Sequence, residues 1–230
     1  RLQSEVFSDS SALMQLSLAP ASGNGSPLSE IETEWSRIRS MGIDMVSAHL
    51  HKTAQPMPEG YMGHRDSGIP DLHDAGLLGP DYHATHANRL TAEELEMLRD
   101  TGGMLCATTM GEFPYVGMGA HRGPSMHARA RAAGVAVGIG MDVSLVLTHD
   151  YFEHVRAAFW SHYMEPAGTE IARDYHAPDV LDYATTLGAR SIRMGDVTGS
   201  ITVGKRADLV LLRTDRIGFA MQGTLADRVV

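Results

Sequence analysis

Three polar side chains stand at the ends of apolar, strand-like runs of the sequence. His49 is the last but one residue of IDMVSAHL, His86 follows YHAT, and Asp142 is the last but one residue of VAVGIGMDV. Each alone has an ordinary structural explanation, as a hydrogen-bonded histidine or as an aspartate that caps a helix. Together they are imidazole and carboxylate donors, which suit a divalent zinc or iron ion if the fold brings the strand ends into one cleft. The 12 histidines of the 230-residue chain point to the same metal or acid-base chemistry.

The elements that must position these side chains alternate between strand-like and helical patterns. Strand-like runs begin near residues 12, 43, 82, 104 and 135, and helical patterns cover 30–41, 91–103, 126–133, 150–163 and 177–188. The helix at 91–103 opens on Thr91 and Glu94, a capping-box pair. Residues 52–71 are rich in Gly, Pro and Met and are expected to form a long loop. The alternation predicts βα units around a parallel sheet.

Two α/β architectures fit such units, an open doubly wound sheet and part of a (β/α)8 barrel. The polar strand ends favour the barrel, because in barrel enzymes that face carries the active site. A dinucleotide-binding sheet is disfavoured, since GMGAHRG lies in a loop after Glu112 and not directly after a strand. After Val197, the sequence TGSITVGKRADLVLLR indicates that the chain leaves the helical layer for a β structure.

Composition excludes several classes of protein. The 19 basic and 28 acidic side chains give a net charge of −9, which argues against a nucleic-acid or anionic-membrane surface. No apolar run reaches the roughly 18 to 20 residues of a membrane span. The single cysteine, Cys106, cannot form an internal disulfide, so we expect a protein of the reducing cytoplasm.

Three longer stretches carry a family resemblance. They are LLGPDYHATHANRLTAEELEML at 77–98, AAGVAVGIGMDV at 132–143 and, most specifically, DYATTLGARSIRMGDVTGSITVGKRADLVLL at 182–212. These stretches resemble the amidohydrolase superfamily, in its cytosine deaminase and chlorohydrolase branch. The resemblance implies a partial (β/α)8 TIM barrel of about five C-terminal βα units that leads into a small β-sandwich. It places the barrel part at 1–196 and the start of the β-sandwich at 197–230.

The resemblance also implies roles for the strand-end residues. His49 matches the fifth-strand metal ligand, and Asp142 matches the last-strand aspartate, a ligand that also takes a proton from the attacking water. His86 matches the sixth-strand histidine, which orients the water or substrate or binds metal directly, and His83 is its competitor within the same strand. The implied cofactor is a divalent metal, zinc or iron, which lowers the pKa of its water toward neutrality. The implied reaction is hydrolysis of a non-peptide carbon–nitrogen bond in a small cyclic amidine or heteroaromatic substrate.

The sequence departs from the family pattern at the proton shuttle. Deaminases of this branch carry a glutamate three residues after the fifth-strand histidine, and here that position is Lys52. An ammonium group cannot exchange protons near neutral pH without a large pKa shift. His51 and Glu112 are the candidates for an acid at the substrate-binding side of the site.

A second departure concerns the first strand of the family, which ends in His-x-His. The only His-x-His in this chain is His49 and His51, and it precedes the sixth-strand motif. We therefore expect the chain to be a C-terminal portion of the family's barrel. The alternative is a truncated or non-catalytic remnant without a complete metal site. Unpaired strand edges in such a partial barrel would favour a homo-oligomer.

Overall fold

A computed structural model describes residues 1–9, 12, 14–20, 26–50, 68–87, 90–111, 126–142, 145, 147–163, 175–215 and 223–230 of the chain. Its strands form a four-stranded sheet in the order β1-β2-β3-β4. The strands are β1 Val46–Leu50, β2 Tyr82–His86, β3 Met104–Ala107 and β4 Val137–Ile139. Strands β1 and β2 pair in parallel, with Val46 opposite Tyr82 and Leu50 opposite His86. The chain divides within β3 into two compact units, Arg1–Leu105 and Cys106–Val230.

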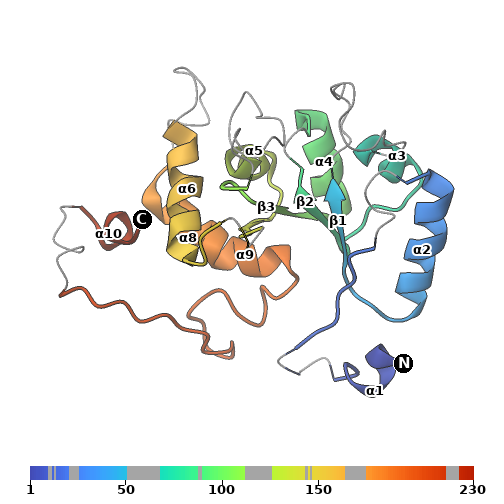
Figure 1. Ribbon diagram of the computed structural model, residues 1–230, viewed down its shortest axis with the longest axis horizontal. Helices are drawn as coiled ribbons and strands as arrows, with labels where there is room; N and C mark the ends of the chain where they lie inside the picture. The colour runs from blue at the N-terminus through green and yellow to red at the C-terminus, as the bar shows by residue number, and fades with distance from the viewer. Residues whose placement is uncertain are drawn as a thin grey trace. The chain divides into compact units, whose positions relative to one another are not determined.

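The first unit contains α1 Leu2–Glu5, α2 Leu28–Ser40, α3 Ile69–Asp74 and α4 Ala92–Thr101 (Figure 1). Helix α2 buries the apolar face that its sequence predicts, with Ile31, Trp35 and Ile38 all 4% exposed or less. The Trp35 ring packs on Tyr82 of β2, with ring centroids 5.3 Å apart. This contact fixes α2 against the same face of β1 and β2 that buries Val46, Ala48 and Ala84.

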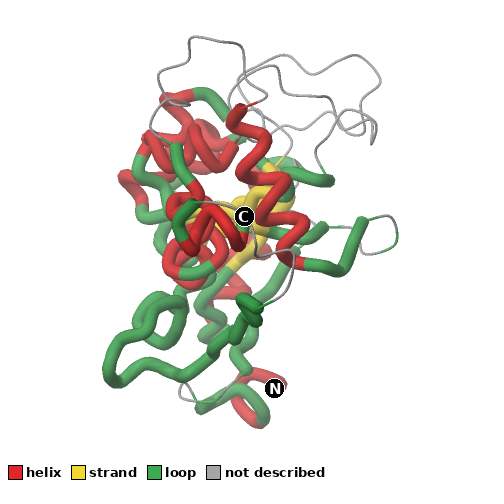
Figure 2. The backbone as a smooth tube through the Cα atoms, turned by 90° about the vertical axis from the view of Figure 1, so that its left-hand side faces the viewer, coloured by secondary structure: helices red, strands yellow, loops and turns green. Residues whose placement is uncertain are grey.

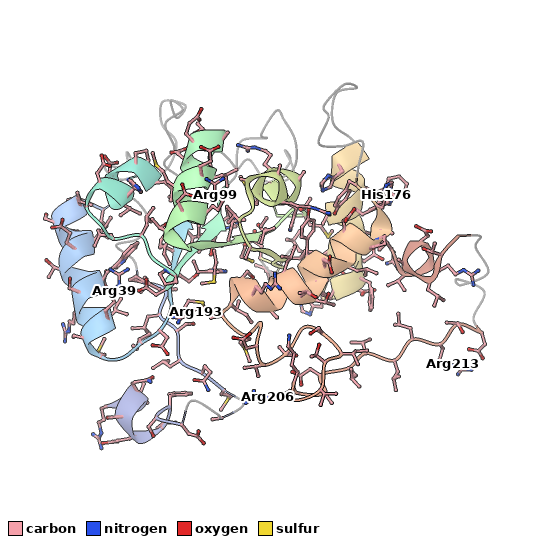
Figure 3. The ribbon with its side chains drawn as sticks, turned by 180° about the vertical axis from the view of Figure 1, so that it is seen from behind. Arg39, Arg99, His176, Arg193, Arg206 and Arg213 are labelled. Carbon is pink, nitrogen blue, oxygen red and sulfur yellow. The ribbon has the colours of Figure 1, made fainter. Side chains whose placement is uncertain are left out.

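Polar contacts fix the ends of two elements in this unit. The expected capping box opens α4, because the Thr91 hydroxyl accepts from the Glu94 amide (3.2 Å) and the Glu94 carboxylate accepts from the Thr91 amide (2.8 Å). Arg39 (Figure 3) reaches from α2 to Asp81, directly before β2, and its Nε donates to the carboxylate over 2.6 Å. The start of β2 is thereby tied to the helix that covers it.

The second unit contains α5 Met126–Ala133, α6 Tyr151–Tyr163, α8 Ala177–Ala184, α9 Thr186–Ser191 and α10 Leu225–Val229. Helices α8 and α9 pack against β4, and α6 packs against α8. Val137 of β4, Val180 and Tyr183 are fully buried in this layer. Within the described ranges, none of the helices combines the length and the apolar character that crossing a membrane requires.

Three elements differ in detail between the structure and the expectation from sequence. The strand near residue 12 is reduced to one parallel bridge between Leu18 and Val46, because among the described residues of this stretch only Leu18 exchanges backbone hydrogen bonds with the chain at 45–47. The expected loop at 52–71 includes the start of α3, whose second residue, Pro70, suits a helix N-terminus. The helix expected at 177–188 is broken at Thr185, whose hydroxyl bonds back to the Leu181 carbonyl over 2.6 Å.

The segment from 197 to 215 forms turns and extended chain but no strand (Figure 2). Its turn is held by Lys205, whose ammonium donates to the Ser200 hydroxyl over 2.8 Å. The apolar side chains Ile201, Val203 and Leu211 are 94%, 103% and 94% exposed. The β pieces expected from Val197 onward are therefore not formed in this segment, and the division at 196/197 stays a prediction.

Candidate functional site

Two of the predicted site residues meet at the carboxyl ends of β1 and β2. His49 is opposite Thr85, and His86 is opposite Leu50, so the two histidines stand one step apart on neighbouring strands. Their ring centroids lie 5.0 Å apart, with the planes inclined by 41°. A zinc–imidazole bond is about 2.0–2.1 Å, which puts the centres of two rings on one zinc ion roughly 5 Å apart. Both rings therefore lie close enough to reach one ion.

The pair differs in exposure. His86 is 5% exposed, whereas His49, the last but one residue of β1, is solvent-exposed. A buried imidazole is held in one orientation by its neighbours, and an exposed one is accessible to an incoming ion or substrate. The two histidines therefore provide one fixed and one accessible donor.

Backbone conformation marks the same positions. His86, Ala87 and Asp142 have positive φ angles of 68°, 54° and 56°, and the only other such non-glycine residue in the described ranges is Arg193. A left-handed conformation is unfavourable for residues with a β carbon and persists where the surroundings enforce it, often at functional sites. Two of the three predicted ligands are thus held in uncommon conformations: His86 at the last position of β2, and Asp142 three residues after β4.

Asp142 belongs to the second unit, where it follows β4. The Gly140 amide donates to the Ala107 carbonyl over 2.9 Å, which joins the end of β4 to the end of β3. The Asp142 carboxylate lies against Gly111, so closely that a β carbon at position 111 would be 2.1 Å from Oδ2. The side chain itself is exposed. Asp142 therefore presents a carboxylate beside the loop that follows β3.

The remaining predicted site residues, His51 and Glu112, lie outside the described residues, as does Lys52. Within the described ranges, no group of three His, Cys, Asp or Glu side chains is placed to hold a metal ion. The structure thus brings His49 and His86 together and places Asp142 in the other unit. The three-residue ligand set and the roles of His51 and Glu112 stay predictions.

A polar cluster that we did not predict lies on the same face of β1 and β2 as His49. The Ser47 hydroxyl is 2.9 Å from His83 Nδ1 and 3.3 Å from the Thr85 hydroxyl. Burial lowers the pKa of His83 to about 4, so its ring is neutral near pH 7. The period-two alternation of Ser47 and His49 with Val46, Ala48 and Leu50 was the available sequence signal for this cluster. His83, the competitor of His86, is therefore a buried residue within the strand.

The second unit buries several histidines in its core. His127 is held between Thr109, whose hydroxyl is 3.2 Å from Nδ1, and Tyr183, whose hydroxyl donates to the His127 carbonyl over 3.2 Å. His162 is 1% exposed and stacks on Tyr175. Burial, followed by the charges of His127 and Arg131, lowers the pKa of His162 to about 3. Part of the histidine surplus in the sequence is thus structural.

The buried neutral histidine His162 predicts a stability that depends on pH. Its folded pKa of about 3 lies below the usual 6.5, so the unfolded chain binds the extra proton between these values. The stabilisation is complete above pH 6.5 and is lost as the pH falls toward 3. We expect His162→Phe to flatten the decline of the unfolding free energy between pH 6.5 and 4, measured by urea titration.

The exposed His73 provides the control for this experiment, because His73→Gln removes a histidine from the surface of α3. It should leave the decline unchanged. An equally steep decline in His162→Phe and in the unaltered chain would show that His162 titrates normally in the folded state.

Comparison with known proteins gives consistent matches. A protein-family model, described as the amidohydrolase family, matches residues 46–229 of the chain. The chain is 27% identical over 168 residues to a 5-methylthioadenosine/S-adenosylhomocysteine deaminase of Teredinibacter turnerae, which covers 73% of the chain but only 36% of that protein. It is similar in fold to a zinc-bound adenosine deaminase of Xanthomonas campestris (24% identity, TM-score 0.69, 86% of this chain and 44% of that one). An atrazine chlorohydrolase variant of Arthrobacter aurescens, crystallised with zinc and atraton, gives a TM-score of 0.78 at 18% identity and covers 99% of this chain and 49% of that one.

Proposed function

Because the chain belongs to the amidohydrolase family, we propose that it takes part in metal-dependent hydrolysis of a non-peptide carbon–nitrogen bond in a small molecule. The observation that carries the proposal is the adjacency of His49 and His86, with ring centroids 5.0 Å apart at the ends of two parallel strands. The chain spans 36% of the length of the deaminase it matches. The proposal therefore concerns the part of the site that these residues supply.

The donor set fits a divalent ion of the zinc type. Two imidazoles and one carboxylate, from His49, His86 and Asp142, are nitrogen and oxygen ligands that zinc accepts, and iron is the alternative. When bound, such an ion lowers the pKa of a water molecule toward neutrality. His86 holds its imidazole in a fixed, buried position, and His49 supplies the exposed donor. The Asp142 carboxylate accepts the proton of the attacking water and returns it to the leaving group.

The substrate class follows from the relatives. The matched proteins are named as deaminases of adenosine compounds and as a chlorohydrolase of a triazine, and all these compounds are nitrogen heteroaromatics. We therefore propose a cyclic amidine or heteroaromatic substrate whose ring carbon carries an amino group or a halide. Lys52 stands at the position of the deaminases' glutamate. We therefore propose that another residue, His51 or Glu112, donates the proton to the ring nitrogen of the substrate.

The finer architecture is part of the same proposal. We propose that residues 1–196 form about five C-terminal βα units of a (β/α)8 barrel and that 197–230 begin a small β-sandwich. Sequential strand order and the parallel pairing of β1 with β2 support the barrel units. The exposed apolar side chains between Ile201 and Leu212 support the β-sandwich proposal, because such side chains become buried when the segment pairs with another strand.

The experiment measures zinc content and substrate turnover of the purified chain. We expect about one equivalent of zinc per chain and release of ammonia from an aminopurine nucleoside or of ammonia or chloride from a substituted triazine. A folded chain that binds no divalent metal and releases neither product from these compounds would refute the proposal.

A further inference from the structure

The contact between Asp142 and Gly111 is closer than any residue with a β carbon would allow. A β carbon added to Gly111 would lie 2.1 Å from Oδ2, 3.0 Å from Cγ and 3.1 Å from Cβ of Asp142. Ordinary carbon contacts are about 3.5–4.0 Å. The whole side chain of Asp142, and not only its tip, therefore occupies the space that the bare Cα of Gly111 leaves open.

The backbone fixes both sides of this contact. Gly111 follows β3 and Asp142 follows β4, and the hydrogen bond from the Gly140 amide to the Ala107 carbonyl holds the two strand ends together. The φ of 56° at Asp142 turns its backbone into the left-handed region, where few alternatives exist for a residue with a β carbon. The direction of the carboxylate is thus set by two strand ends and one glycine.

We propose that Gly111 is a positioning residue for Asp142, because its missing side chain leaves open the space that the carboxylate occupies. The inference rests on the proposed function, which makes Asp142 a ligand and proton acceptor. Gly111 also directly precedes Glu112 in the sequence.

The substitution Gly111→Ala separates this role from a structural one. Asp142 is exposed, so rotation of its side chain moves Cγ and Oδ2 away from a new methyl group toward solvent. A backbone shift of a few tenths of an ångström relieves the remaining contact with Cβ, and the fold is retained. We expect the thermal unfolding midpoint to stay close to that of the unaltered chain. The affinity for Co²⁺, used as a spectroscopic probe for zinc, should fall by about tenfold to a hundredfold because a ligand is displaced.

A matched control exists in the same unit. At Gly195 a β carbon would lie 2.7 Å from Cγ of Arg190, which is again a flexible side chain, but no predicted ligand is involved. Gly195→Ala should leave Co²⁺ affinity unchanged. In an Asp142→Ala background, Gly111→Ala should cause no further loss of affinity, because the side chain that it displaces is gone.

A second readout keeps the inference testable apart from metal binding. The ¹³Cγ resonance of Asp142 in the metal-free chain should shift in Gly111→Ala and stay in place in Gly195→Ala. If the unaltered chain and Asp142→Ala bind Co²⁺ with the same affinity, the proposed role of Asp142 as a ligand fails. The Asp142 resonance alone then decides whether Gly111 positions the side chain. An unshifted Asp142 resonance in Gly111→Ala would overturn the inference. Full Co²⁺ affinity in Gly111→Ala, with Co²⁺ affinity lowered in Asp142→Ala, would also overturn it.

Discussion

Asp142→Asn should lower substrate turnover by at least about a hundredfold, because general acid-base catalysis typically contributes 10²–10⁴. The amide keeps the size of the side chain but cannot accept a proton from the attacking water. It also removes the negative charge that a divalent ion would balance. Initial rates of ammonia or chloride release, measured at saturating zinc, give the comparison.

The control for this variant is Asp182→Asn, an exposed carboxylate on α8 of the same unit. It should keep the unaltered rate. Equal turnover in Asp142→Asn and Asp182→Asn would show that Asp142 carries no catalytic proton and that its left-handed backbone serves the loop alone.

Trp35→Ala should destabilise the first unit by about 3–5 kcal/mol, the usual cost of removing a large aromatic side chain from a core. Trp35 is 0% exposed, and its ring is packed on Tyr82 at 5.3 Å. Its removal leaves a cavity between α2 and β2 that the anchored Arg39 and Asp81 prevent from closing. Urea unfolding followed by far-ultraviolet circular dichroism measures the loss.

The second tryptophan of the chain provides the comparison. Trp160 on α6 is 59% exposed, so Trp160→Ala should change the unfolding free energy by roughly 0.5 kcal/mol or less. A cost for Trp35→Ala no greater than that for Trp160→Ala would contradict the packing of α2 on the sheet.

Elements with strong local signals were predictable from sequence. The apolar spacing of Ile31, Trp35 and Ile38 predicts the buried face of α2, and Thr91 with Glu94 predicts the start of α4, both of which the structure confirms. In each case the signal lies within one or two helical turns. The end of β2 at His86 was also predicted, from a strand-like segment and from its alignment with the family's sixth strand.

Features that depend on a competing side-chain bond or on a partner strand were not predictable. The break at Thr185 depends on a side-chain bond to the Leu181 carbonyl, which competes with a helical pattern that continues through Gly188. The β propensity of Leu209 and Val210 does not produce a strand in this segment, because a strand needs a partner and the described chain provides none there.

The candidate site also contains residues that local sequence signals predict and a residue that they do not. His49 and His86 could be found from strand ends, since adjacent parallel strands end at one edge. Gly111 could not, because a glycine after a strand gives no sign of which side chain will lie against it. The contact with Asp142 arises from the meeting of two loops that are about 30 residues apart in the sequence.

The central claim is that His49 and His86 bind one metal ion together, and metal content measured by mass spectrometry tests it most directly. We expect about one equivalent of zinc in the unaltered chain and in the surface variant His73→Ala. The double variant His49→Ala/His86→Ala should retain less than about a tenth of an equivalent while it keeps its circular dichroism spectrum. Equal zinc content in the double variant and in His73→Ala, or a folded unaltered chain without bound zinc or iron, would contradict the claim.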